Sequence, residues 1–306
     1  MRLLHAFSAT LASLSLAACG GDDGGSPIDA STPDAELPNP GFVKPDSVTK
    51  ANENGTEVGD ADWTCLNTPS DDVATSVEIT LTGVINKIDD PNAEVKDVIV
   101  SVFEGTDYMN PLDTTDAPTA LDGAFTLTLP AGHTRWGFKV TGAPIMDTWL
   151  LNQYFEPATA SQSRNIGVAT TAIAAALPAL VDLDRIPGSG VLAGAVRDCQ
   201  QREVSHAVAT VSATSGTADH LENADSYYVQ TAVGLPVRHD ALLHTDTVGE
   251  FAVFNLPVTA TAYIQVWGFV DAADLADGEM TLLAELPSPV VGDTVITGSV
   301  DPLRSN

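Results

Sequence analysis

The sequence predicts an all-β protein: two tandem antiparallel β-sandwiches, a short alanine-rich connecting helix and a disordered N-terminal tether. Three observations support this prediction. Short runs alternate apolar and polar residues with a period of two, which is typical of strands with one buried face. Four of these runs return in the same order later in the chain. The N-terminal part is instead rich in proline and acid and poor in large apolar residues.

Residues 1–18 have the composition of a secretory signal peptide. Arg2 supplies a positive charge, and a mostly apolar run over residues 3–18 follows it. This run is too short to remain in a bilayer as a spanning helix. Its last residues and the next, LAAC, resemble the bacterial lipobox, whose cysteine is acylated and becomes the first residue of the mature chain. The resemblance implies a lipoprotein held in the bilayer by palmitate on Cys19; the alternative is an ordinary signal peptide with a chance cysteine.

Residues 19–62 are expected to form a disordered acidic tether that ends near Trp63. Residues 20–62 hold five prolines and ten acidic residues against Lys44 and Lys50. Such a segment buries too little apolar surface to offset the entropy lost on ordering. Its glycine-rich start is typical of a flexible spacer.

Residues 63–167 are predicted to form the first sandwich. The stretches with strand-like alternation are rich in Val, Ile, Thr and Phe and are separated by Gly, Pro and Asp. They are SVEITLTGVI (76–85), VKDVIVSVFEG (95–105), GAFTLTLPAG (123–132) and RWGFKVTG (135–142).

Residues 168–189 are predicted to form a connecting helix and a hinge. The stretch VATTAIAAALPALV (168–181) is too short for a membrane span and contains Pro178. Its alanines favour a small helix packed against a sandwich. The following RIPGSG (185–190) is expected to act as the hinge between the domains.

Residues 190–306 are predicted to form the second sandwich, because the four runs return there. Gly83 aligns with Gly194 at an offset of 111 residues, and Gly123 aligns with Gly249 at an offset of 126. The second copy therefore carries about 15 extra residues, within 217–247. The repeated runs are GVLAGAVRD (190–198), VSHAVATVSATSG (204–216), VGEFAVFNLP (248–257) and TAYIQVWGF (261–269).

The motif at residues 122–132, DGAFTLTLPAG, resembles the carboxypeptidase-regulatory-like domains. These belong to the transthyretin-like (prealbumin-type), Ig-like sandwiches and are similar to the B-type repeats of Gram-positive adhesins. In the second copy Val248 replaces the aspartate and Val258 the last glycine. The resemblance implies a compact spacer or binding module and does not assign an activity, because fold does not determine function.

The sequence predicts no enzymatic activity and assigns no catalytic residue. Some transthyretin-like proteins are hydroxyisourate hydrolases with a C-terminal Tyr-Arg-Gly-Ser, but this chain ends DPLRSN. No Gly-x-Ser-x-Gly elbow, phosphate-binding loop or dinucleotide fingerprint is present in the sequence. The adjacent carboxylates Asp71–Asp72 and Asp89–Asp90 are expected to be solvated in polar turns.

The charge balance disfavours nucleic acid as a partner. The chain has 13 lysines and arginines against 41 acidic residues, for a net charge of −28. Neutralisation of phosphates supplies most of the affinity for nucleic acids, and an acidic chain lacks the cations for it. Binding to anionic lipid head groups is disfavoured for the same reason, which leaves the acyl chains to attach the protein.

Cys65 and Cys199 remain for a disulfide once Cys19 is assigned to lipid. Oxidation is the default in an exported chain, and the bridge would close a loop of about 134 residues. Two buried free thiols are the alternative.

No metal site and no cofactor are predicted. The second copy contains four histidines, of which only His239 and His244 are close in sequence. Their spacing of five does not fit a helical zinc motif and would place them on opposite faces of a strand. We interpret the set as scattered surface residues: His206, His220, His239 and His244.

Exposed aromatic residues would point to carbohydrate binding. Trp136 and Trp267 lie in strand-like runs and are expected in the core. The segment TWLLNQYF, with Trp149, Tyr154 and Phe155, is the candidate ligand surface, and packing against the first sandwich is the alternative.

The predicted function is that of a membrane-anchored envelope lipoprotein acting as a non-enzymatic structural or protein-interaction module, whose partner would be another envelope protein. The alternative is a cell-surface lipoprotein that binds carbohydrate or peptide. By analogy with lipoprotein sorting in Gram-negative cells, Gly20 after Cys19 implies delivery to the outer membrane.

Overall fold

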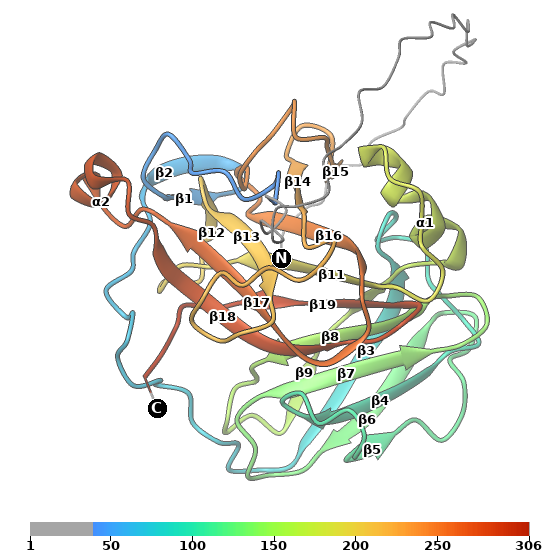
Figure 1. The fold of residues 1–306 in the computed structure, drawn as a ribbon. Helices are drawn as coiled ribbons and strands as arrows, with labels where there is room; N and C mark the ends of the chain where they lie inside the picture. The colour runs from blue at the N-terminus through green and yellow to red at the C-terminus, as the bar shows by residue number, and fades with distance from the viewer. Residues whose placement is uncertain (1–38, 306) are drawn as a thin grey trace, which may run out of the picture. The chain divides into compact units, whose positions relative to one another are not determined.

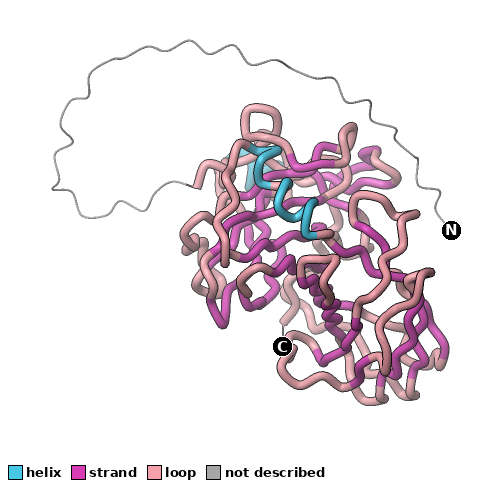
Figure 2. Tube along the Cα trace, turned by 90° about the vertical axis from the view of Figure 1, so that its right-hand side faces the viewer, coloured by secondary structure: helices cyan, strands magenta, loops and turns pink. Residues whose placement is uncertain are grey.

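The computed structural model describes residues 39–305, and residues 1–38 and 306 lie outside the described part of the chain. The predicted signal peptide, Cys19 and the first part of the tether therefore fall outside it. Strands dominate residues 39–305, and the helices there are short (Figures 1 and 2). The predicted all-β class is confirmed, and so is the short alanine-rich helix, α1 (Thr171–Ala176).

The first sandwich consists of two facing sheets. One sheet has the order β10-β3-β6, with β9 also paired to β3, and the other contains β5-β4-β7-β8. All four runs predicted for this domain contain strands. The strands are β3 (Ile79–Lys87), β4 (Ile99–Glu104), β5 (Asp113–Thr114), β6 (Ala124–Leu129), β7 (Trp136–Thr141), β8 (Asp147–Gln153), β9 (Ser161–Ser163) and β10 (Ile166–Val168).

The second sandwich is built in the same way from the following half of the chain. One sheet contains β15-β14-β16-β11-β19 and the other has the order β13-β17-β18. The strands are β11 (Gly190–Val196), β12 (Glu203–Ser205), β13 (Val208–Ser212), β14 (Ser226–Gln230), β15 (Leu235–Pro236), β16 (Glu250–Leu256), β17 (Thr259–Gly268), β18 (Thr281–Val290) and β19 (Thr294–Val300).

The pairing of strands repeats between the two sandwiches. Strand β3 lies between antiparallel β6 and the parallel strands β9 and β10. Strand β11 likewise lies between antiparallel β16 and parallel β19. In the facing sheets, β4-β7-β8 corresponds to β13-β17-β18. The extra residues of the second copy supply β14 and β15 at the edge of its sheet.

One sheet is shared by both sandwiches. Strand β8 pairs in parallel with β19, with residues 147–151 opposite residues 294–298. This pairing joins the four strands β5-β4-β7-β8 and the five strands β15-β14-β16-β11-β19 into a single nine-stranded sheet (Figure 1). The two predicted domains are therefore connected by backbone hydrogen bonds as well as by the chain.

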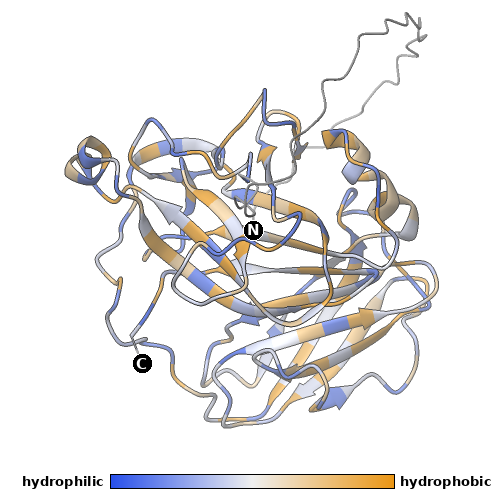
Figure 3. Ribbon diagram, viewed as in Figure 1, coloured by the Kyte–Doolittle hydropathy of each residue, from blue (hydrophilic) through white to orange (hydrophobic). Residues whose placement is uncertain are grey.

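Strand β8 is buried on both faces, because each face covers a different core. Trp149 and Leu151 pack with Phe103 of β4 into the core of the second sandwich. Leu150 points the other way and packs against the core of the first sandwich. Figure 3 shows hydrophobic residues along the strands of both sandwiches. A strand between two cores has no polar face to mark its period.

Residues 39–62 are ordered, which corrects the prediction that the whole tether is disordered. Strands β1 (Lys50–Glu53) and β2 (Thr56–Asp60) form a small sheet of order β12-β1-β2. Thr49 is fully buried, and its N–H and hydroxyl both donate to the carbonyl of Phe269, at 3.0 and 3.1 Å. The segment buries little apolar surface of its own. Main-chain hydrogen bonds to strand β12, which lies far along the chain, hold the segment instead. Amino-acid composition does not indicate pairing between segments that are distant in sequence.

The connection between the sandwiches is held against the second one. The Thr170 side chain caps α1 by accepting from the N–H of Ile173, and a 3-10 turn, Pro178–Val181, follows the helix. Beyond it, the Ile186 N–H donates to Asn255 Oδ1 at 2.9 Å, and Gly188 and Arg185 both donate to Asp293. The expected hinge is thus tied to the second sandwich at several points.

The other helix, α2 (Ala272–Asp277), lies between β17 and β18. None of the helices between residues 39 and 305 has the length and apolar character that a membrane-spanning helix needs.

Candidate functional site

Two histidines that the sequence separates by 38 positions lie side by side. The ring centroids of His206 and His244 are 4.6 Å apart, with an angle of 36° between the rings. His206 follows β12 with a left-handed φ of 61°, and His244 lies in the loop that precedes β16. The interpretation of these histidines as scattered surface residues is therefore wrong for this pair.

Thr245 fixes the relative positions of the two histidines. Its carbonyl accepts the N–H of His206 at 2.9 Å and lies 3.1 Å from Nδ1 of His244. Its N–H donates to the carbonyl of Ala207 at 2.8 Å, and its hydroxyl accepts the N–H of Ala207 at 3.0 Å. Because Thr245 is fully buried, these bonds hold the two imidazoles on a rigid backbone frame.

Glu57 on strand β2 orients the ring of His206. Its Oε1 lies 3.1 Å from Nε2 of His206 and accepts the hydroxyl of Ser205 at 3.2 Å. A carboxylate at this distance favours a proton on Nε2, which leaves the lone pair on Nδ1. That Nδ1 is buried and has no hydrogen-bond partner among the described residues.

Asp46 completes the cluster from the segment that was predicted to be disordered. One ligand atom from each of Asp46, His206 and His244 lies within 4.8 Å of the others. Asp46 is exposed, whereas both histidines are half-buried. Sequence analysis missed this cluster because its members come from three separate segments, and no local spacing connects them.

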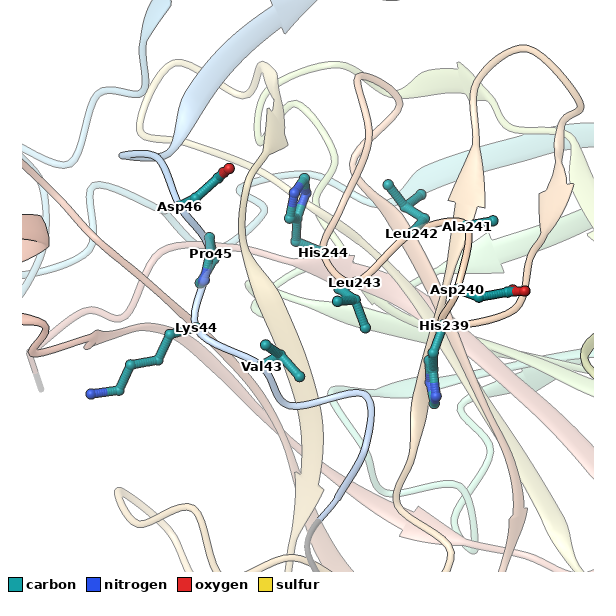
Figure 4. A pocket seen from close by; sticks show the side chains of 10 residues that line it. All are labelled: Val43, Lys44, Pro45, Asp46, His239, Asp240, Ala241, Leu242, Leu243 and His244. Atoms are coloured by element: carbon teal, nitrogen blue, oxygen red, sulfur yellow. The ribbon is translucent and has the colours of Figure 1, made fainter.

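A cavity of about 320 Å³ lies beside the cluster, between residues 43–46 and the loop 239–244. Asp46 and His244 lie at the same end of it, and His239 lies at the other (Figure 4). The loop lies within residues 217–247, the stretch in which the second copy is longer than the first. This stretch therefore supplies one wall of the cavity and one of the histidines.

The two remaining histidines of the second copy are engaged elsewhere. The ring of His239 stacks on Tyr227 at 4.5 Å, and its Nε2 lies 3.2 Å from the carbonyl of Ser226. Nδ1 of His220 lies 2.6 Å from the hydroxyl of Thr210. Neither belongs to the Asp46 cluster.

The predicted aromatic ligand surface is wrong, because its residues are not exposed together. Trp149 is 1% exposed and Phe155 is 4% exposed, and they belong to the cores of different sandwiches. Trp136 is fully buried, as predicted, whereas Trp267 is only half-buried. The physical reason is the position of β8, which lies between two cores.

Tyr154, the remaining aromatic residue of the candidate ligand surface, packs beside Arg135, whose guanidinium carbon is 5.4 Å from the ring centroid. Arg135 donates from Nε to Asp72 at 2.6 Å and from Nη1 to Asp301 at 2.9 Å. Burial raises the pKa of Asp301 above its usual value, although the charge of Arg135 acts in the opposite direction. This cluster joins the segments that flank both sandwiches and has a structural role.

Cys65 and Cys199 form the expected disulfide, with their Cα atoms 5.8 Å apart. Next to it, Asp198 is fully buried and accepts the guanidinium of Arg202 together with the backbone N–H groups of Asp62, Gln200 and Arg202. The N–H of Cys199 donates to the carbonyl of Asp62 at 2.9 Å. The disulfide thus links Cys65 to a turn, residues 198–202, that hydrogen bonds already hold beside Asp62.

The adjacent carboxylates form no paired site. Asp89 and Asp90 are both exposed, and Asp90 accepts the N–H of Asn92 at 3.1 Å, as in a polar turn. Asp71 is exposed, and Asp72 is bound to Arg135.

The sequence matches no family model and no curated protein. Among solved structures, it is similar to the shaft pilin SpaA from Lactobacillus rhamnosus GG, with 12% identity over 75% of this chain and 98% of the pilin and a TM-score of 0.21. A DUF3823 family protein from Parabacteroides merdae has 13% identity over 71% of this chain and 98% of its own, with a TM-score of 0.21.

The Bacillus anthracis TIE protein has 11% identity over 74% of this chain and a TM-score of 0.24, and the chain spans only 34% of its length. All these TM-scores are low, so the fold assignment rests on the strands themselves. The resemblance to carboxypeptidase-regulatory-like domains stays a prediction.

Proposed function

We propose that the protein is a membrane-anchored envelope lipoprotein whose two sandwiches act as a non-enzymatic structural or protein-interaction module. The observation that carries this proposal is the fusion of the sandwiches. A nine-stranded sheet, the burial of β8 between the two cores and a disulfide between Cys65 and Cys199 join residues that the sequence divides into two domains. A connection of this kind suits a spacer that holds a partner at a fixed distance.

The N-terminal sequence supports the proposed location at the membrane. The LAAC stretch and the glycine-rich residues after Cys19 have the composition of a lipoprotein anchor and its flexible spacer. Gly20 supports delivery to the outer membrane. The acyl chains of Cys19 would supply the contact with the bilayer, and an envelope protein would be the partner.

The alternative function, carbohydrate binding, is less well supported. It depended on an exposed aromatic face at residues 149–155, and Trp149 and Phe155 are buried. An envelope partner is therefore the better proposal than a glycan.

The anchor is tested by labelling bacteria that express the full chain with radioactive palmitate. The wild-type chain should take up the label and partition into detergent, and Cys19→Ser should do neither. The double variant Cys65→Ser/Cys199→Ser is the matched control, since it removes both cysteines outside the lipobox and should keep the label. Unlabelled wild-type chain would overturn the lipoprotein proposal.

The module is tested by chemical cross-linking in intact envelopes, followed by screening of the detergent-solubilised full chain on a glycan array. The proposal expects a discrete protein adduct and no glycan retention. Saturable retention on one glycan class without any protein adduct would favour the alternative.

A further inference from the structure

We infer that Asp46, His206 and His244 form a binding site for one divalent transition metal ion, with Zn²⁺ as its representative. The site is independent of the proposed anchor and partner. Two imidazoles and a carboxylate are donors that Zn²⁺ accepts readily, and the same set suits Co²⁺, Ni²⁺ and Fe²⁺. Soft thiolates are not needed, and both cysteines of the described residues are bonded to each other.

The distances are close to those of a bound site. One ligand atom from each residue lies within 4.8 Å of the others. Ligand atoms of a tetrahedral zinc ion are about 3.4 Å apart, because each lies about 2.1 Å from the metal. Asp46 is exposed, so its carboxylate has room to rotate towards the two imidazoles when an ion binds.

The hydrogen bonds of the two histidines prepare one nitrogen on each ring for a metal. Nε2 of His206 faces Glu57, and Nδ1 of His244 faces the carbonyl of Thr245. Each acceptor holds a proton on the nitrogen that it faces, which leaves a lone pair on the opposite nitrogen. Pairs of this kind, a ligand histidine with a carboxylate or carbonyl behind it, are typical of metal sites.

Nδ1 of His206 is the most direct pointer to a ligand. It is buried and has no hydrogen-bond partner among the described residues. A buried polar atom without a partner is unfavourable, and native proteins satisfy nearly all of them. A metal ion between His206 and His244 would satisfy this nitrogen.

The surroundings suit an ion that is only partly enclosed by protein. The net charge of −28 raises the local concentration of cations. The cavity between residues 43–46 and 239–244 leaves room for water as further ligands beside Asp46 and His244. Three protein ligands with water in the remaining position are the arrangement of an open zinc site.

The proposal is tested by calorimetric titration of the untagged full chain with Zn²⁺ after treatment with EDTA. The expected result is saturable binding of one ion per chain and a metal-dependent rise in the melting temperature. His244→Ala should weaken binding by at least 100-fold. Glu57→Gln, which changes a positioning residue, should weaken it by roughly 10-fold, in the range found for outer-shell partners of metal ligands.

Two variants keep the test decisive. Asp46→Asn changes an exposed side chain and leaves the core intact, so its loss of affinity cannot come from misfolding. His239→Ala is the matched control, because it removes an imidazole at the other end of the same cavity. Far-UV circular dichroism without metal should be the same for all variants.

Replacement of Zn²⁺ by Co²⁺ adds a spectroscopic readout, since ligand-field bands report nitrogen and oxygen donors around the ion. These bands should appear with the wild-type chain and His239→Ala and be lost with His244→Ala. The proposal is overturned if the wild-type chain binds no saturable ion, or if folded Asp46→Asn and His244→Ala bind as tightly as the wild type.

Discussion

Gly83 lies opposite Phe125 in the paired strands β3 and β6, and the ring of Phe125 occupies the space that a side chain at Gly83 would need. A Cβ atom added to Gly83 would lie 2.7 Å from Cε1 of Phe125. In the second sandwich Gly194 lies opposite Phe251, and a Cβ atom there would lie 2.9 Å from its ring. Both rings are buried, so the two phenylalanines occupy matching core positions, as the repeat predicts.

The shared sheet predicts that both sandwiches unfold together. Phe125→Ala and Phe251→Ala each remove a buried ring, and each should lower the free energy of unfolding by about 3–5 kcal/mol. Because strands β8 and β19 are paired, either change should shift one common transition, by on the order of 10 °C. Differential scanning calorimetry measures this.

Leu121→Ala is the control for these variants, since Leu121 is 80% exposed and its loss should change the transition little. Two transitions, of which each variant shifts only one, would support instead the independent domains that the sequence alone suggests.

The disulfide should stabilise the protein mainly by restricting the unfolded chain. The double variant Cys65→Ser/Cys199→Ser should lower the free energy of unfolding by about 2–5 kcal/mol, because the bridge closes a long loop. The circular dichroism spectrum of the folded state should be unchanged. Peptide mapping without reductant should recover the linked pair, and full alkylation of both thiols without reductant would contradict the bond.

Arg135 should hold the segments that flank the two sandwiches. Arg135→Met removes the cationic partner of Asp72 and Asp301 and should lower the free energy of unfolding by about 1.5–3 kcal/mol at neutral pH. Arg238→Met is the matched control. Its ion pair with Asp182 is exposed, so the change should stay within about 0.5 kcal/mol.

The deficit of Arg135→Met should depend on pH through Asp301. Burial already raises the pKa of Asp301 in the folded state, and loss of the arginine charge raises it further. A carboxyl whose pKa is raised in the folded state binds protons more tightly in the folded than in the unfolded chain. The free energy of unfolding therefore falls as the pH rises from the unfolded pKa of Asp301 through its folded pKa. Acidification towards pH 4 should therefore shrink the deficit, and Arg135→Met/Asp301→Asn should abolish this dependence. A deficit that is constant from pH 4 to 7 would contradict it.

Tyr228 should hold the N-terminal segment on the second sandwich. Its buried hydroxyl accepts the N–H of Ala209 at 3.1 Å and donates to the carbonyl of Gly41 at 2.8 Å. Tyr228→Phe leaves both groups without this partner, which should lower the free energy of unfolding by about 1–3 kcal/mol. Limited proteolysis should cut residues 39–48 faster in this variant than in Tyr154→Phe. Equal rates in the two variants would show that the Tyr228 hydroxyl does not hold this segment.

The strands that repeat could be predicted because their signal is local. The alternation in the repeated runs gives the strand period, and the repeat places Phe125 and Phe251 at matching positions, without knowledge of the partner strands. For the segment that contains strand β8, the sequence left a ligand surface and core packing open, because only tertiary packing shows that each face of the strand covers a core. Composition likewise reported the low apolar content of residues 39–62 but not strand β12, which pairs with β1 of this segment.

The cluster of Asp46, His206 and His244 could not be predicted for a related reason. His206 is placed by a left-handed backbone turn, His244 by the carbonyl of Thr245, and Asp46 by a segment that docks from the opposite end of the chain. None of these three placements has a spacing in sequence that distinguishes it from chance.

The bridge between Cys65 and Cys199 also determines how the molecule would respond to tension. When the two ends of the chain are pulled apart, the covalent path runs from residue 65 directly to residue 199 through the sulfur atoms. Residues 66–198 lie inside the closed loop and include the whole first sandwich and helix α1. Mechanical load along the covalent path would bypass the backbone of residues 66–198, so the first sandwich could not be drawn out into an extended chain while the bond is intact. Force would reach it only through non-covalent contacts such as the pairing of β8 with β19.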